Sequence, residues 1–411
     1  MSFSATRRHF FAWTQGALAL GASGGRLSRG ETTTVDYYDK LGVTKIINAA
    51  GTYTALTASI MPPSVQAAVA QAAQHPVRLA ELQKAAGEYL AQKLHCEAAL
   101  VTAGAASGLT LATAACVTRG HAKAVAKIPV DLSDLKNEVI VQKAHRNDYD
   151  HALLNCGIRF VEVETLAEYE RAFTSQTTMA HFFNAAESGS ISREDWIRVA
   201  HSHQVPCLND AAADVPPIAN LWNYTKMGFD LVAFSGGKGM RGPQNAGLLL
   251  GRKELIDAAV LNAMPISATI GRGMKVAKEE IVGMVAAVDW FLSQTDEGME
   301  KEFTARANRI VEHLRGIPTL QSRVVIPPVA NRIPHLVLTY DQAKVRIAPA
   351  AVADALRHGS PCIELNPATG HKNANGVTGD EDAIVVGVWM LQPGEDLIVA
   401  QRLRDVLSKA T

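Results

Sequence analysis

A single lysine lies in a glycine-rich turn past the middle of the chain. Lys238 follows an apolar run, Leu231–Phe234, and is surrounded by Gly236, Gly237, Gly239 and Gly242. The run predicts a short buried strand, and glycines give the backbone access to positive φ and let a flat ligand approach closely. A lysine at the end of a buried strand loses its proton more readily than one in water. The neutral amine is the form that attacks a carbonyl group to form a Schiff base.

Two other interpretations of the Lys238 turn stay open. One is a solvated lysine in an ordinary glycine-rich loop, and the other is a phosphate-binding loop. A Walker loop places Ser or Thr after its lysine at the start of a helix, whereas Gly239, Met240 and Arg241 follow here. The polar residues upstream of Lys238 help to distinguish between these interpretations.

Polar side chains follow several predicted strands. The strand Val205–Asp210 ends in an acid, and a further strand over 178–184 ends at Asn184. His145 follows Val139–Gln142, where it is placed to stack on a planar ring. Proteins of the α/β class bind ligands at the carboxyl ends of their strands. For the His145 segment alone, a polar surface loop is the competing interpretation.

Small residues connect a strand to a helix near residue 104. The strand Ala98–Thr102 is followed by Gly104, Ala105 and Ala106 and then by the apolar helix Leu109–Val117. Free backbone N–H groups at such a turn point at an anion, with the helix dipole behind them, so the turn predicts a phosphate cradle. Close packing between strand and helix explains the same small residues equally well.

The alternation of strands and helices from about residue 98 to 250 predicts an α/β fold, with a mostly parallel sheet sandwiched by helices. The pattern changes after Lys253 to long helices and shorter alternating segments, which predict a smaller C-terminal α+β domain. We therefore expect an N-terminal signal and linker over 1–34, a large domain with an N-terminal arm over 35–260, and an interdomain helix with the small domain over 261–411.

The composition of the chain argues against two classes of function, nucleic-acid binding and metal binding. The chain has 47% hydrophobic and 19% charged residues, as soluble globular proteins do, and its formal net charge is zero. A neutral chain lacks the basic face that a dedicated nucleic-acid binder needs. The five cysteines stand far apart, and His201 and His203 have no third ligand nearby in the sequence, so we expect no metal site.

The N-terminus resembles a twin-arginine export signal. Arg7 and Arg8 precede Phe10, a mildly apolar run continues to Ala22, and small residues follow. The run is too short to span a membrane as a mature helix, so we expect no stable membrane anchor. The prediction is export to the periplasm, or a cytoplasmic protein if the signal is not used. A basic amphipathic start is the alternative.

Two short motifs carry a resemblance to a known family. Asp210-Ala-Ala-Ala and Ser235-Gly-Gly-Lys238-Gly together resemble fold-type-I enzymes that use pyridoxal 5′-phosphate (PLP). The resemblance is strongest to the branch of selenocysteine synthase (selenium transferase) and D-glucosaminate-6-phosphate ammonia-lyase, and it extends from about Tyr37 to Leu407. It implies PLP as the cofactor and the PLP-dependent transferase fold.

The resemblance also implies roles for individual residues. Lys238 is similar to the lysine that forms the Schiff base and moves protons at the substrate Cα. Asp210 is similar to the acid that pairs with the pyridine nitrogen and makes the ring a better electron sink. His145 resembles the residue that stacks on the ring, and Asn184 is placed to contact its phenolic oxygen. The remaining implied cofactor contacts are the cradle Gly104, Ala105 and Ala106, the hydroxyl of Ser235, and Arg272 reaching a neighbouring subunit.

The resemblance implies a PLP-dependent lyase acting on an amino acid or amino sugar acid, by α,β-elimination. A racemase, aldolase or transferase on the same scaffold is the alternative, because protein contacts select the bond that breaks; a non-catalytic PLP-binding protein is another. Members of this fold form homodimers or larger oligomers. Neutral charge and the export signal disfavour a tRNA substrate, and Glu364 lies where an arginine for an anionic substrate is expected.

Overall fold

The computed structural model describes residues 35–184, 189–327, 331–371 and 381–411, and it divides the chain into the units 1–45 and 46–411. In the first unit, the described part forms helix α1 (Tyr37–Leu41). Asp36 caps this helix by accepting hydrogen bonds from the backbone N–H groups of Tyr38 and Asp39. Lys45 forms ion pairs with Asp36 at 2.6 Å and Asp39 at 2.9 Å. The predicted export signal, 1–34, lies outside the described residues.

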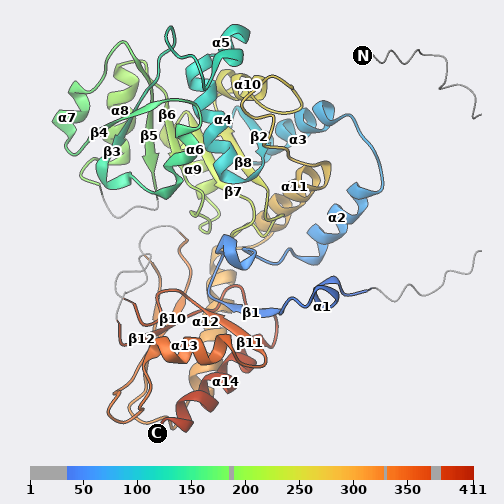
Figure 1. The fold of residues 1–411 in the computed structure, drawn as a ribbon, viewed down its shortest axis with the longest axis vertical. Coiled ribbons are helices and arrows are strands. Elements are labelled where there is room, and N and C mark those ends of the chain that lie inside the picture. The colour runs from blue at the N-terminus through green and yellow to red at the C-terminus, as the bar shows by residue number, and fades with distance from the viewer. Residues whose placement is uncertain (1–34, 185–188, 328–330, 372–380) are drawn as a thin grey trace, which may run out of the picture. The chain divides into compact units, whose positions relative to one another are not determined.

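The second unit is built on a seven-stranded sheet, with the order β2-β8-β7-β6-β5-β3-β4 (Figure 1). Its strands are β2 (Ala98–Thr102), β3 (Glu138–Gln142), β4 (Arg159–Val163), β5 (Thr177–Phe183), β6 (Cys207–Asp210), β7 (Leu231–Ser235) and β8 (Gly247–Gly251). Only β8 runs antiparallel to its neighbours, so the predicted mostly parallel sheet is confirmed.

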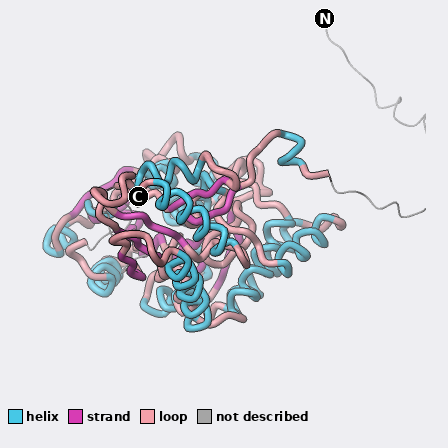
Figure 2. Tube along the Cα trace, turned by 90° about the horizontal axis from the view of Figure 1, so that it is seen from below, coloured by secondary structure: helices cyan, strands magenta, loops and turns pink. Residues whose placement is uncertain are grey.

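Both faces of this sheet are buried, which explains the continuous apolar runs of its strands. Successive side chains of a strand point to opposite faces. Accordingly, Leu248 and Leu250 belong to one hydrophobic core, whereas Leu249 belongs to the other. Figure 2 shows helices lying on both sides of the strands.

Each core is closed by its own set of helices. The first core is covered by α2 (Pro63–Ala73), α3 (Leu79–Lys93), α7 (Leu166–Arg171), α8 (Arg193–Ser202), α9 (Asn220–Met227) and α11 (Lys278–Leu292). The second is covered by α4 (Gly104–Thr118), α6 (His151–Leu154) and α10 (Lys253–Leu261), while the short α5 (Ala122–Lys127) follows α4 and packs against it. The alternation of strand and helix that the sequence predicts is thus what buries the sheet on both sides.

The C-terminal region forms a third core of its own. An antiparallel sheet with the order β12-β10-β9 and the parallel pair β1-β11 pack with three helices. Their bounds are β1 (Ile46–Ala49), β9 (Gln321–Val325), β10 (His335–Thr339), β11 (Cys362–Leu365), β12 (Ala383–Gly387), α12 (Asp296–His313), α13 (Pro349–Arg357) and α14 (Glu395–Lys409).

Strand β1 shows how the start of this unit joins its end. Ile46 pairs with Cys362, and Ile47 and Ala49 are buried in the C-terminal core. The sequence assigns this segment to the large domain, but β1 packs with the smaller one. The predicted domain boundaries themselves stay predictions. Among the described residues, no helix is long and apolar enough to cross a membrane.

Candidate active site

Parallel strands bring the predicted site residues to one edge of the large sheet. Asp210 and Ser235 are the last residues of β6 and β7, Asn184 directly follows β5, and Gly104 begins the helix after β2. His145 ends a 3₁₀ helix, η2 (Lys143–His145), that follows β3. Because these strands are parallel, all five positions lie at their carboxyl ends, where α/β folds bind ligands.

The loop that carries Lys238 is tightly packed. Its backbone closes through hydrogen bonds from Gly236 N to Ala246 O and from Gly242 N to Gly236 O, both 2.8 Å. A Cβ atom at Gly239 would lie 2.1 Å from the carbonyl oxygen of Val215. There is no room for a side chain at position 239, so the residue after Lys238 must be glycine. The close packing holds the backbone on both sides of Lys238 in place.

The amine of Lys238 has an unusual environment. Burial lowers the pKa of Lys238, while the nearby carboxylates of Asp210 and Asp214 act in the opposite direction. The side-chain amine of Lys238 forms no hydrogen bond or ion pair with any described residue. A partly buried amine with a lowered pKa and no partner is available for covalent chemistry.

Asp210 is buried, with 3% of its surface exposed. Its Oδ1 accepts a hydrogen bond from Ala212 N at 3.0 Å. Burial raises the pKa of Asp210 to about 6, opposed by that hydrogen bond and by Lys238. The two side chains interact electrostatically without forming an ion pair, so the carboxylate lacks a cationic partner in contact. A protonated pyridine nitrogen is such a partner, and the site fits PLP in this respect.

The start of α4 also fits a phosphate group. Gly104 has a φ of +74°, and no side chain caps the helix. The hydroxyl of Ser107, in the first turn, is buried and has no hydrogen-bond partner in the described part of the chain. Free N–H groups, a helix dipole and an unpartnered hydroxyl are what a bound phosphate satisfies. Ser107 was not singled out from the sequence, because only its burial beside the free helix end distinguishes it.

A cavity of about 480 Å³ opens against this helix start. Ala103, Ala106 and Ser107 line it together with Asn245 and Lys275. Lys238, Asp210 and His145 do not line this cavity. Arg272 lies beside Gly273, which does line it, while the predicted contact of Arg272 with a neighbouring subunit stays a prediction.

His145 is buried and uncharged. Burial and the nearby Arg193 lower the pKa of His145 to about 4. Its Nδ1 accepts a hydrogen bond from Phe183 N at 3.2 Å, and its ring meets the Phe182 ring edge-on at 4.5 Å between centroids. The imidazole is thus held by two residues of the neighbouring strand β5. A neutral ring suits the predicted stacking role, which stays a prediction.

The side chain of Asn184 forms hydrogen bonds with neighbouring side chains that the sequence does not predict. Its Nδ2 donates to Asp214 Oδ2 and to the Tyr224 hydroxyl, and its Oδ1 accepts from Arg193 Nε at 2.5 Å. Tyr224 in turn donates to Asp214 Oδ2 at 3.1 Å. Both amide protons are in use, so a contact with a ring oxygen would require one of these bonds to break. The roles of Arg193, Asp214 and Tyr224 were missed, since α8 and α9 bring two of them from separate parts of the sequence.

Glu364 does not present an isolated negative charge. Arg357 Nε lies 3.1 Å and 3.0 Å from the two carboxylate oxygens of Glu364, and Arg357 Nη2 lies 3.0 Å from one of them. The guanidinium of Arg357 therefore balances the negative charge of Glu364, the residue that stands where an arginine is expected.

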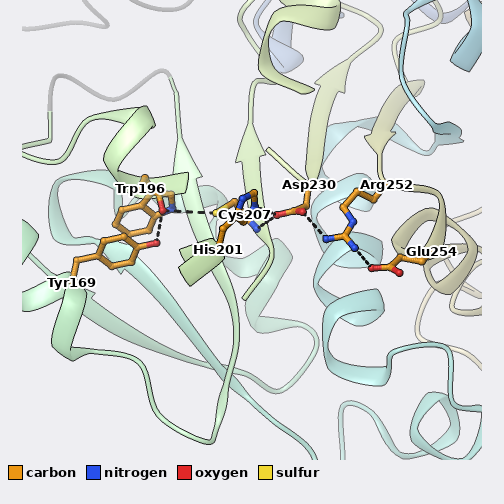
Figure 3. Close-up of polar contacts among 7 residues, drawn as sticks. All are labelled: Tyr169, Trp196, His201, Cys207, Asp230, Arg252 and Glu254. Atoms are coloured by element: carbon orange, nitrogen blue, oxygen red, sulfur yellow. Dashed lines mark hydrogen bonds and ion pairs between the residues drawn. The ribbon is translucent and has the colours of Figure 1, made fainter. Parts of the chain in front are cut away.

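Three potential metal ligands gather at the opposite end of β6 and β7 (Figure 3). Donor atoms of His201, Cys207 and Asp230 lie within 4.8 Å of one another, so His201 has neighbours that the sequence does not reveal. Asp230, however, already accepts hydrogen bonds from His201, Cys207 N and Arg252. Burial raises the pKa of the Cys207 thiol well above its usual value. The protein itself thus satisfies this carboxylate, and the group joins α8, β6 and the segment before α10.

Comparison with known proteins places this site in a family. The family model of L-seryl-tRNA selenium transferase (SelA) matches residues 46–306, well over half of the chain. The chain belongs to the SelA family. SelA-family enzymes and the related ammonia lyase are PLP-dependent, which agrees with the free Lys238 amine, the unpaired Asp210 and the open start of α4.

This SelA-family chain is similar to enzymes with different named activities. It is 30% identical to a 5′-C-glycyluridine monooxygenase-decarboxylase of Streptomyces sp, over 80% of this chain and 83% of that protein. It is 27% identical to D-glucosaminate-6-phosphate ammonia lyase of Salmonella typhimurium (strain 14028s / SGSC 2262), over 92% of this chain and 99% of that protein. A solved structure of D-glucosaminate-6-phosphate ammonia-lyase superposes with a TM-score of 0.79, at 27% identity and with coverage of 92% and 99%.

Proposed function

We propose that this SelA-family enzyme catalyses α,β-elimination on an amino acid or amino sugar acid. The observation that carries the proposal is the partly buried Lys238 amine, which has a lowered pKa and no bonding partner among the described residues, close to the buried Asp210. Elimination is favoured over other PLP reactions by the similarity to an ammonia lyase across nearly the whole chain.

Each residue has a defined task in this proposal. PLP, when bound, supplies an electron sink for the carbanion at the substrate Cα. Lys238 would hold the cofactor through its amine, and the same amine in its neutral form would take the proton from the substrate Cα. Asp210 would hold the ring nitrogen, where its ionised carboxylate keeps a proton in place. The start of α4, with Ser107, would hold the phosphate.

The neighbouring groups tune this machinery. Asp210 and Asp214 stabilise the charged form of Lys238, whereas burial favours the neutral form. The net effect is a lowered pKa of Lys238, which increases the share of the neutral amine that can act as a base. Neutral His145 covers the site without adding charge, so it does not compete with the ring nitrogen for Asp210.

A second candidate reaction is racemisation, aldol cleavage or group transfer at the same centre. The comparison with relatives supports keeping this candidate. One relative is named an ammonia lyase and another a monooxygenase-decarboxylase, so similar chains have different named reactions. A non-catalytic PLP-binding protein is a third candidate, disfavoured by the retention of both Lys238 and Asp210.

We propose a small-molecule substrate and no nucleic-acid partner, because the chain has no net charge with which to bind a tRNA. We also propose a homodimer or larger homo-oligomer. Export by the twin-arginine route to the periplasm completes the proposal, and it rests on Arg7 and Arg8 in the sequence.

A product screen tests the reaction. PLP-loaded protein is incubated with D- and L-amino acids and with amino sugar acids, and keto acid and ammonia are measured. Elimination predicts both products in equal amounts from at least one substrate, with loss of turnover in Lys238→Ala. Lys253→Ala, at an exposed lysine paired with Asp257, is the matched control. Inversion of a substrate without ammonia would instead establish a racemase.

A further inference from the structure

A second, smaller cavity lies behind the loop that carries Lys238. Its volume is about 160 Å³, and its wall includes Gly239, Arg241, Trp290, Glu302, Arg306 and Trp389. Arg241 belongs to the lysine loop, Trp290 to α11 and Arg306 to α12, while Trp389 follows β12. The cavity is thus formed where the lysine loop meets the helices and the C-terminal sheet of this unit.

Two hydrogen-bond donors in this wall have nothing to bind. The Nε of Arg241 and the indole Nε1 of Trp389 are both buried, and neither forms a hydrogen bond with a residue that the structure describes. Trp389 is only 5% exposed. Buried donors without partners are rare in folded proteins, because each costs about 1–3 kcal/mol when water is removed. Both residues line the same cavity, so its wall carries two donors that lack an acceptor.

The guanidinium of Arg241 also lacks a counter-charge. It stacks over the Trp290 ring at 5.9 Å and forms no ion pair with any described residue. Burial and the nearby Arg306 both lower the pKa of Arg241. Leaving two like charges close together, one of them without an anion, is unfavourable unless a ligand completes the site.

The other charges in the wall are already used. Arg306 donates to the carbonyl oxygens of Val388 and Leu391 at 3.2 Å and 2.6 Å, and to Glu302 at 3.0 Å. Glu302 is 53% exposed in its side chain and is balanced by Arg306. The wall therefore keeps one uncompensated positive charge, on Arg241.

We propose that this cavity binds a small carboxylate, with the Arg241 guanidinium and the Trp389 indole N–H as its donors. A guanidinium presents paired N–H groups that match the two oxygens of a carboxylate. The volume admits only a few non-hydrogen atoms, and Trp290, Met299 and Phe303 supply apolar surface for a short chain. A short aliphatic carboxylate, such as butyrate, fits this combination of charge, size and apolar wall.

Such a ligand would act on the loop of the reactive lysine. Arg241 N donates to Lys238 O at 3.0 Å, and Gly239 contributes to the cavity wall. Binding at Arg241 therefore stabilises the conformation of the residues that flank Lys238. This site needs neither PLP nor the proposed elimination, so it stands or falls independently of the reaction.

Isothermal titration calorimetry on the full-length protein tests this site. Sodium butyrate is titrated at constant ionic strength, with chloride, sulfate and phosphate as separate arms. We expect saturable butyrate binding that weakens at least tenfold in Arg241→Gln and several-fold in Trp389→Phe. Arg198→Gln is the matched control, since Arg198 is an exposed arginine paired with Asp195 on α8. Thermal unfolding of each variant checks that it folds.

Some results would overturn the site. Absence of saturable butyrate binding, or equal affinity in wild type and Arg241→Gln, would contradict it. Tighter binding of sulfate or phosphate than of butyrate would contradict the assignment to a carboxylate. If Arg241→Gln does not fold, Trp389→Phe and Arg241→Lys decide, because both keep the packing and each weakens one proposed donor.

Discussion

Lys238 and Asp210 place opposite charges in one poorly solvated region without letting them touch. Each charge is disfavoured by burial. Their mutual attraction offsets part of the cost for both groups, the hydrogen bond from Ala212 N helps Asp210, and Asp214 helps Lys238 alone. This arrangement is unfavourable for the protein alone, and it becomes favourable once a ligand contacts both groups. The pair is therefore a site for a polar ligand rather than a stabilising ion pair.

The raised pKa of Asp210 predicts how stability depends on pH in the cofactor-free protein. The pKa of Asp210 rises from 3.8 to about 6 on folding, so the folded state binds the proton more tightly. The protonated Asp210 carboxyl stabilises the folded state fully below pH 4. This stabilisation is lost as the pH rises through 6, when the buried carboxyl must ionise. The free energy of unfolding of Asp210→Asn should thus exceed that of the wild type by up to about 3 kcal/mol above pH 7, and the two should be equal at pH 4.

Urea unfolding at pH 4 and pH 7.5 measures this difference. Asp257→Asn, at an exposed acid paired with Lys253, is the control and should change stability little at either pH. An Asp210→Asn variant that is less stable than wild type at pH 7.5 would show that the carboxylate is not destabilised by burial.

Glycine packing in the lysine loop gives a prediction for the elements that position the site. In Gly239→Ala, the new methyl group would collide with the Val215 carbonyl oxygen, so the loop must move. We expect stability to fall by about 1–3 kcal/mol and PLP uptake to weaken. Gly273→Ala is the control for stability, because nothing lies within 4 Å of its added methyl group. Equal melting temperatures for the two variants would contradict the packing argument.

How far the elements could be predicted depends on the range of the contacts that define them. Local patterns of apolar residues were enough to predict the parallel strands of the large sheet. The pairing of β1 with β11 depends on residues more than 300 positions apart, and no local pattern encodes it.

The candidate site shows the same limit. The positions of Asp210, Ser235 and Lys238 follow from the strand ends. The hydrogen bonds that occupy Asn184, and the burial of Ser107, depend on how helices dock. They were therefore beyond what spacing along the chain could reveal.

At the scale of the whole molecule, the N-terminal arginine pair predicts where the protein acts. The Arg7→Lys and Arg8→Lys double substitution should keep the protein in the cytoplasm, because the twin-arginine route recognises the pair itself. Cell fractionation followed by immunoblotting measures the mature form in the periplasm. Arg26→Lys, outside the pair, is the control and should be exported normally. Unchanged export of the double variant would disprove the signal.

The covalent role of Lys238 is tested most directly by trapping. PLP-loaded protein is reduced with borohydride, digested, and analysed by peptide mass spectrometry. The result we predict is a pyridoxyl group on the peptide that contains Lys238, and no such group in Lys238→Ala. A reduced cofactor found on another lysine, or no covalent mark after reduction of fully loaded protein, would contradict the assignment of Lys238 as the residue that holds the cofactor.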